Sequence, residues 1–68
     1  MPIVRVEMSP GRTPQQKADL ARAITDAMFD IAKTAAREEV HVIIIETSPD
    51  NWAIGGDFLS ARRKAKQS

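Results

Sequence analysis

The chain has 68 residues, no cysteine, and 10 Lys and Arg against 9 Asp and Glu. This length suits one domain, spanning 1–68, and the near balance of charge argues against a nucleic-acid or membrane-surface binder. Disulfides and thiolate metal sites are excluded, and the single histidine, His41, has no second histidine with which to form a metal cluster. Because so small a domain is marginal alone, we expect it to be stabilised by association with further chains.

No apolar run approaches the ~18 residues that a transmembrane helix needs. The first residues also lack a basic segment followed by a long apolar core, so we predict no secretory signal and expect the cytoplasm. The end of the chain, about 57–68, forms a basic tail that contains Arg62, Arg63, Lys64 and Lys66. We interpret this tail as solvated or as a short terminal helix, and an alternative is that it closes over the site.

The first predicted element is a strand over residues about 3–8. Val4, Val6 and Met8 alternate there with charged residues, which is the period of a half-buried strand. Turn residues at 9–11 then break the chain.

A helix over about 14–34 follows. Thr13 is the expected N-cap, Pro14 suits the first helical position, and Gln16 completes a capping box. From Leu20 onwards, apolar residues recur at spacings of three and four, so the helix is predicted to present one apolar stripe.

The second predicted strand, about 40–46, is apolar almost throughout, which is typical of a parallel strand covered on both faces. A strand, a helix and a strand make a β-α-β unit with parallel strands and a right-handed crossover. One helix covers only one face of such a sheet, and two strands alone are not stable in water. We therefore predict an obligate oligomer. A short hairpin is expected at about 51–56, ending in Gly55-Gly56.

The usual catalytic signatures are absent from the sequence: there is no cysteine nucleophile, no G-x-S-x-G serine and no glycine-rich phosphate loop. Pro2 is the exception, because removal of Met1 would leave a secondary amine at the tip of the first strand. A free α-amine has a pKa of about 8, which burial and nearby cations lower. A neutral amine near pH 7 is a competent general base. Proline at this position is common, however, and its position alone carries little weight.

Several segments, in this order and at these spacings, resemble the 4-oxalocrotonate tautomerase family over nearly the whole chain. They are Pro2-Ile3-Val4, Gly11-Arg12-Thr13 with Gln16-Lys17, and Trp52-Ala53-Ile54-Gly55-Gly56. The resemblance implies an α/β fold, a β-α-β subunit (4-oxalocrotonate tautomerase/MIF-like) with parallel strands and a C-terminal hairpin. It implies a hexamer, a trimer of dimers. Whether this is a homohexamer or a heterohexamer with a related chain stays open.

The resemblance also implies an activity. This is keto–enol tautomerisation of 2-hydroxymuconate or a similar unsaturated 2-hydroxy or 2-oxo acid, without metal or organic cofactor, in the catabolism of aromatic compounds. Pro2 matches the catalytic proline, and Arg12 matches a substrate-binding arginine whose guanidinium suits a carboxylate. Trp52 matches an aromatic residue that walls the site. The alternatives are a solvated Arg12 at the helix entrance and a Trp52 that anchors a neighbouring subunit.

His41 departs from the family, which places an arginine there to polarise the substrate carbonyl. Histidine donates hydrogen bonds but is not a permanent cation. Four interpretations stay open: His41 does the work less well, another arginine replaces it, a partner chain supplies the cation, or His41 is structural. The candidate replacements are Arg37, Arg62 and Arg63.

Two other functions compete with a tautomerase. Relatives in the superfamily dehalogenate or decarboxylate small acids, and His41 or Glu46 would then activate water. The other is a non-catalytic or partner-dependent subunit of a mixed oligomer.

Overall fold

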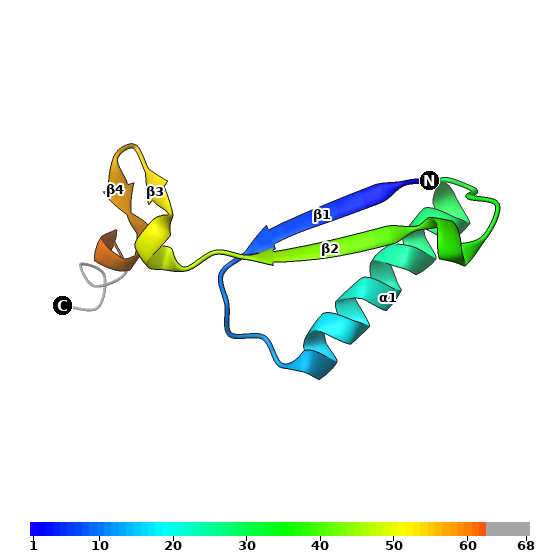
Figure 1. Ribbon diagram of the computed structural model, residues 1–68, viewed down its shortest axis with the longest axis horizontal. Helices are drawn as coiled ribbons and strands as arrows, with labels where there is room; N and C mark the ends of the chain where they lie inside the picture. The colour runs from blue at the N-terminus through cyan, green and yellow to red at the C-terminus, as the bar shows by residue number, and fades with distance from the viewer. Residues whose placement is uncertain (63–68) are drawn as a thin grey trace.

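A computed structural model describes residues 1–62 of the chain. In chain order its elements are β1 (Ile3–Met8), α1 (Pro14–Ile31), the 3-10 turn η1 (Arg37–Glu39), β2 (His41–Glu46), the 3-10 turn η2 (Pro49–Asn51), β3 (Ala53–Ile54) and β4 (Asp57–Phe58). Strands β1 and β2 form one sheet with α1 beside it, and β3 and β4 form a separate hairpin (Figure 1). The predicted β-α-β fold with a C-terminal hairpin is confirmed.

The two long strands are parallel, and their register runs from Ile3 opposite His41 to Met8 opposite Glu46. Side chains on a strand alternate between faces. Glu46 reaches Lys17 of α1, so the face that includes Glu46, Val42 and their register partners lies toward the helix. The opposite face of the sheet has no element of residues 1–62 packed on it (Figure 1).

Helix α1 begins where the sequence predicts but ends at Ile31, three residues before the predicted end at 34. At its start, the Thr13 hydroxyl accepts from the Gln16 amide at 3.1 Å, and the Gln16 side chain accepts from the Thr13 amide at 2.9 Å. At its end, Lys33 has φ of +58°. A residue in this left-handed conformation stops the helical hydrogen-bond ladder, which is why the helix is shorter than its apolar pattern.

The second strand and the hairpin also differ from the predicted bounds. The second strand starts at His41 instead of 40, because the Val40 amide closes the η1 turn by donating to the Arg37 carbonyl at 3.1 Å. The hairpin occupies 53–58, not 51–56. Gly55 and Gly56, with φ of +62° and +92°, form its two-residue loop instead of its end.

The predicted basic tail, 57–68, is therefore partly structured. It begins with β4, and helical backbone resumes at Leu59 and continues to Arg62. Its remaining basic residues, Arg63, Lys64 and Lys66, lie outside the described residues. The assignment of the whole chain to one domain stays a prediction.

None of residues 1–62 is buried in the single chain. The radius of gyration is 15.8 Å, against about 11 Å for a compact domain of this length, because the hairpin forms an arm that projects from the sheet (Figure 1). Exposed apolar side chains lie on the uncovered sheet face, the helix and the arm, and include Ile3, Phe29, Ile31, Ile43, Ile54 and Phe58. A single chain thus lacks the closed core that a stable domain requires.

Within residues 1–62, no helix combines the length and apolar character needed to cross a membrane.

Candidate active site

Pro2 lies at the tip of β1, beside the start of β2. Its carbonyl accepts a hydrogen bond of 2.9 Å from the His41 amide, so the parallel strands begin side by side. Met1 is 80% exposed and extends away from the fold, whereas Pro2 is partly shielded. Removal of Met1 would therefore free the Pro2 nitrogen without loss of packing. While Met1 is attached, this nitrogen is a tertiary amide and cannot act as a base.

The His41 side chain is exposed and belongs to the sheet face that α1 leaves uncovered. Pro2 lies two residues before Val4, whose side chain faces the helix, so alternation places the Pro2 side chain on the helix side. The two residues are backbone neighbours, but their side chains belong to opposite faces. His41 is thus placed to meet a ligand or a chain that approaches from the uncovered face.

Arg12 lies at the opposite end of the sheet, in the loop between β1 and α1. Six residues of β1 separate the two ends, which is about 20 Å of extended chain. The Arg12 side chain is exposed, and its Nη1 donates to the Ser9 carbonyl at 3.3 Å. Gly11, with φ of +128°, precedes it and the capping box at Thr13 follows it, so the Arg12 backbone is held on both sides.

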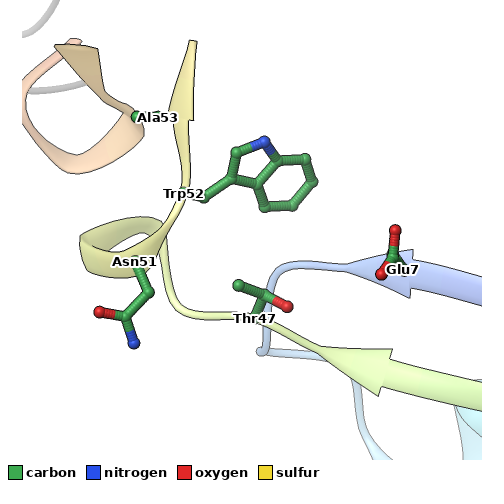
Figure 2. Close-up of a pocket in the computed structure, with 5 residues that line it drawn as sticks. All are labelled: Glu7, Thr47, Asn51, Trp52 and Ala53. Atoms are coloured by element: carbon green, nitrogen blue, oxygen red, sulfur yellow. The ribbon is translucent and has the colours of Figure 1, made fainter. Parts of the chain in front are cut away.

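Trp52 lines an open cleft of about 310 Å³ where the arm leaves the sheet. Figure 2 shows the indole ring over this space, with Thr47 below it and the end of β1 beside it. The Trp52 carbonyl accepts from the Leu59 amide at 2.7 Å, which holds the base of the arm. The lining residues are Glu7, Thr47, Asn51, Trp52 and Ala53.

The four predicted site residues do not converge within one chain. Pro2 and His41 lie at the amino-terminal end of the sheet, while Arg12 and Trp52 lie at or beyond its carboxyl-terminal end. The cleft contains Trp52 but none of the other three. One site that uses all four residues therefore requires residues from more than one chain.

The alternatives for a cation near His41 are also placed by the structure. Arg37 lies just before β2, but its Nη1 is paired with the Asp26 carboxylate of α1 at 2.5 Å. Arg62 lies at the end of the arm, and Arg63 falls outside the described residues. Within residues 1–62 of a single chain, neither Arg37 nor Arg62 brings a free guanidinium to His41.

Glu46, the other candidate for water activation, is held on the helix side of the sheet. Its Oε1 lies 2.6 Å from Lys17 Nζ, and both side chains are about one-third exposed. His41 belongs to the opposite face, so the two do not form a pair. In the part of the chain that the structure describes, no three His, Asp or Glu side chains gather to hold a metal ion.

The sequence reasoning assigned no role to Arg5, Glu7, Thr47 or Asn51. Alternation within β1 indicated only that Arg5 and Glu7 share its polar face. The parallel register brings Arg5 near His41, and the turn of the arm brings Glu7 near Trp52. The shared start of the two strands was the signal that could have identified Arg5.

Comparison with known proteins gives a consistent result. The family model described as tautomerase enzyme matches residues 2–62. A 2-hydroxymuconate tautomerase of Bacillus subtilis is 38% identical over 60 residues, which are 88% of this chain and 95% of that protein.

Solved structures are similar over the same region. TomN, a 4-oxalocrotonate tautomerase homologue in the tomaymycin biosynthetic pathway, superposes with a TM-score of 0.86 at 40% identity, covering 93% of this chain and 95% of TomN. A heterohexamer 4-oxalocrotonate tautomerase from Chloroflexus aurantiacus gives 0.79 at 37% identity, covering 88% and 95%.

Proposed function

The chain belongs to the tautomerase family and is an isomerase of the 4-oxalocrotonate tautomerase type, and we propose that it interconverts the enol and keto forms of 2-hydroxymuconate or a similar unsaturated 2-hydroxy or 2-oxo acid. The observation that carries this proposal is the position of Pro2. Its nitrogen lies at the tip of β1, capped only by an exposed Met1, beside the start of β2. The similar 2-hydroxymuconate tautomerase supports the substrate class.

In the proposed reaction the neutral Pro2 amine takes the proton of the enol hydroxyl. The resulting ammonium delivers a proton to a carbon of the conjugated chain, which restores the amine and leaves the ketone. Negative charge develops on the substrate oxygen during the first transfer, so hydrogen-bond donors aimed at that oxygen lower the barrier. In the assembled site, burial and cations from neighbouring chains would lower the pKa of this amine below that of an ordinary α-amine, which would make it a useful base near neutral pH.

The proposed site takes residues from more than one chain. Arg12 and Trp52 are separated from Pro2 by the length of the sheet, so they would come from neighbouring copies. The lack of any buried residue among 1–62 and the projecting arm support such an assembly. We expect a hexamer, either of one chain or of two related chains. Arg12 would bind the substrate carboxylate that lies farther from the reacting oxygen, and Trp52 would exclude water.

The test begins with the intact mass of natively expressed protein, followed by 2-hydroxymuconate ketonisation against pH in the same sample. The expected result is a mass that lacks one methionine, with kcat/KM rising with pH through an apparent pKa below about 8. The rise follows because only the unprotonated amine accepts the enol proton. Pro2→Ala should retain the oligomer and lose most of the activity, and normal turnover by this variant would refute the proposal.

A second candidate is a partner-dependent subunit of a mixed hexamer. His41 motivates it because the family resemblance places an arginine there, and the similar Chloroflexus aurantiacus enzyme is a heterohexamer. If the purified chain alone is inert and becomes active only with a co-expressed related chain, this candidate replaces the first. An active hexamer of the single chain excludes it.

A dehalogenase or decarboxylase is the remaining enzymatic alternative. Its water-activating candidates are His41 and Glu46, and the second is engaged by Lys17. Turnover of a 3-haloacrylate faster than that of the dienol would favour it. Cytoplasmic location and a role in aromatic catabolism stay predictions.

A further inference from the structure

The uncovered face of the sheet carries two polar side chains close to the Pro2 end. This face is formed by alternate residues of both strands, namely Ile3, Arg5, Glu7, His41, Ile43 and Ile45. Apart from Arg5, Glu7 and His41, all of them are isoleucine. Of these three polar residues, Arg5 and His41 lie nearest Pro2. An exposed apolar face that carries such a polar pair is a candidate binding surface.

Arg5 and His41 are diagonal neighbours on this face. Arg5 pairs with Ile43, and Ile43 is two residues beyond His41, so the Cβ atoms of Arg5 and His41 are expected to be about 7 Å apart. Arg5 is three residues from Pro2, which is about 10 Å along the strand. Both Arg5 and His41 are exposed in the single chain.

The Arg5 guanidinium is available to a ligand. Within residues 1–62 it makes no ion pair, whereas Arg37, which lies just before β2, is held by Asp26. Glu7, the acid on the same face, lies two residues farther from Pro2 and lines the cleft with Trp52. A small anion bound beside Arg5 therefore meets a permanent cation that no ion pair of the described residues neutralises.

We infer that Arg5 and His41 together form a carboxylate-binding subsite at the Pro2 end of the uncovered face. The planar Arg5 guanidinium provides the permanent charge and two parallel N–H donors, and the His41 ring adds a further hydrogen bond. Ile3 and Ile43 flank the pair; both are exposed in the single chain and would exclude water once a further chain covers this face. The nature of the ligand rests on the proposed function. In that reaction the subsite binds the carboxylate next to the reacting oxygen.

The inference explains how the second strand can carry histidine in place of an arginine. The permanent charge is supplied from β1 instead of β2, on the same face and two register pairs farther along the sheet. His41 then needs only to donate a hydrogen bond, which either of its ring nitrogens can do.

The test measures binding of trans,trans-muconate, a six-carbon dicarboxylate with no hydroxyl to tautomerise, by calorimetry on the processed, assembled protein. Sorbate has the same carbon chain and one carboxylate. Arg5→Gln should weaken muconate binding about 10- to 100-fold, as expected for loss of a charge-assisted bidentate contact, and should abolish the preference for muconate over sorbate. The matched control is Arg22→Gln, which removes the same charge from an exposed helix position paired with Asp19 and should leave binding unchanged.

A second variant relocates the charge. Arg5→Gln combined with His41→Arg should recover most of the lost affinity, because the guanidinium then projects from the neighbouring strand on the same face. In kinetics, Arg5→Gln should raise KM more than it lowers kcat. If Arg5→Gln alters the oligomer mass, Arg5→Lys replaces it, and several-fold weaker muconate binding is expected because the ammonium lacks the planar fork.

Muconate affinity that is unchanged in Arg5→Gln or Arg5→Lys would overturn the inference, as would an equal loss in Arg22→Gln. The binding test also separates this inference from the proposed reaction. Arg5-dependent muconate binding by a protein whose Pro2→Ala variant turns over normally would retain the subsite and reject the mechanism. If tautomerase activity depends on Pro2 but muconate binding does not depend on Arg5, the mechanism is retained and the subsite is rejected.

Discussion

Replacement of Thr13 by alanine is expected to destabilise the start of α1 and to disturb Arg12 at the same time. The Thr13 hydroxyl accepts from the Gln16 amide at 3.1 Å, and the Gln16 side-chain oxygen accepts from the Thr13 amide at 2.9 Å. Loss of an N-cap hydroxyl costs about 1 kcal/mol, within a range of roughly 0.5–2. The site is exposed, so water takes over part of the lost bond and the cost should fall near the centre of that range.

The assay is urea unfolding at one fixed protomer concentration, because the stability of an oligomer depends on concentration. In a thermal melt at the same protomer concentration, a loss of about 1 kcal/mol corresponds to a fall in Tm of roughly 4–8 °C for a chain of this size. The KM for 2-hydroxymuconate should rise several-fold, since Arg12 directly precedes the altered cap.

Thr25→Ala is the matched control, because it makes the same substitution within the same helix. The Thr25 hydroxyl donates to the Ala21 carbonyl at 2.8 Å and caps nothing. Alanine has the higher helix propensity, so stability should change by less than about 0.5 kcal/mol and KM should not change. Equal losses in the two variants would refute the reasoning, because they would show that the capping box has no particular role.

Three further results are expected. Arg12→Ala should raise the KM for a dicarboxylate substrate about 10-fold or more while a monocarboxylate is affected less, which steady-state kinetics on the two substrates will show; equal effects on both would argue that Arg12 is only a solvated residue. Trp52→Ala should lower both the thermal stability of the oligomer and kcat, measured by calorimetry and turnover, whereas a loss of stability alone would leave Trp52 as an anchor. Gly56→Ala should cost about 1–2 kcal/mol in urea unfolding because its φ of +92° strains any residue with a Cβ, and unchanged stability would contradict the two-residue hairpin loop.

The sequence predicted well those features that depend on neighbouring residues. The start of α1 followed from Thr13, Pro14 and Gln16, since a capping box is made entirely within one turn. The end of α1 did not follow, because Lys33 adopts a left-handed conformation that its residue type does not announce. The hairpin was placed two residues too early, because Gly55 and Gly56 suited either its end or its loop equally well in the sequence alone.

The candidate site illustrates the same limit over longer distances. The family resemblance singled out Pro2, Arg12, His41 and Trp52 from order and spacing, but spacing along a chain does not say which residues meet. The structure places two of them at each end of the sheet, which the sequence could not show.

By itself, the sequence determined the β-α-β order, the capped helix and the need for further chains, because these depend on local hydrogen bonds and on the balance of apolar faces. Only the tertiary structure decided that Arg5 shares a face with His41 and that Arg37 is held by Asp26. The physical reason is that strand register and ion pairs across the fold join residues that are distant in the chain. A shift of the register by one residue would turn Arg5 to the opposite face and remove the proposed subsite.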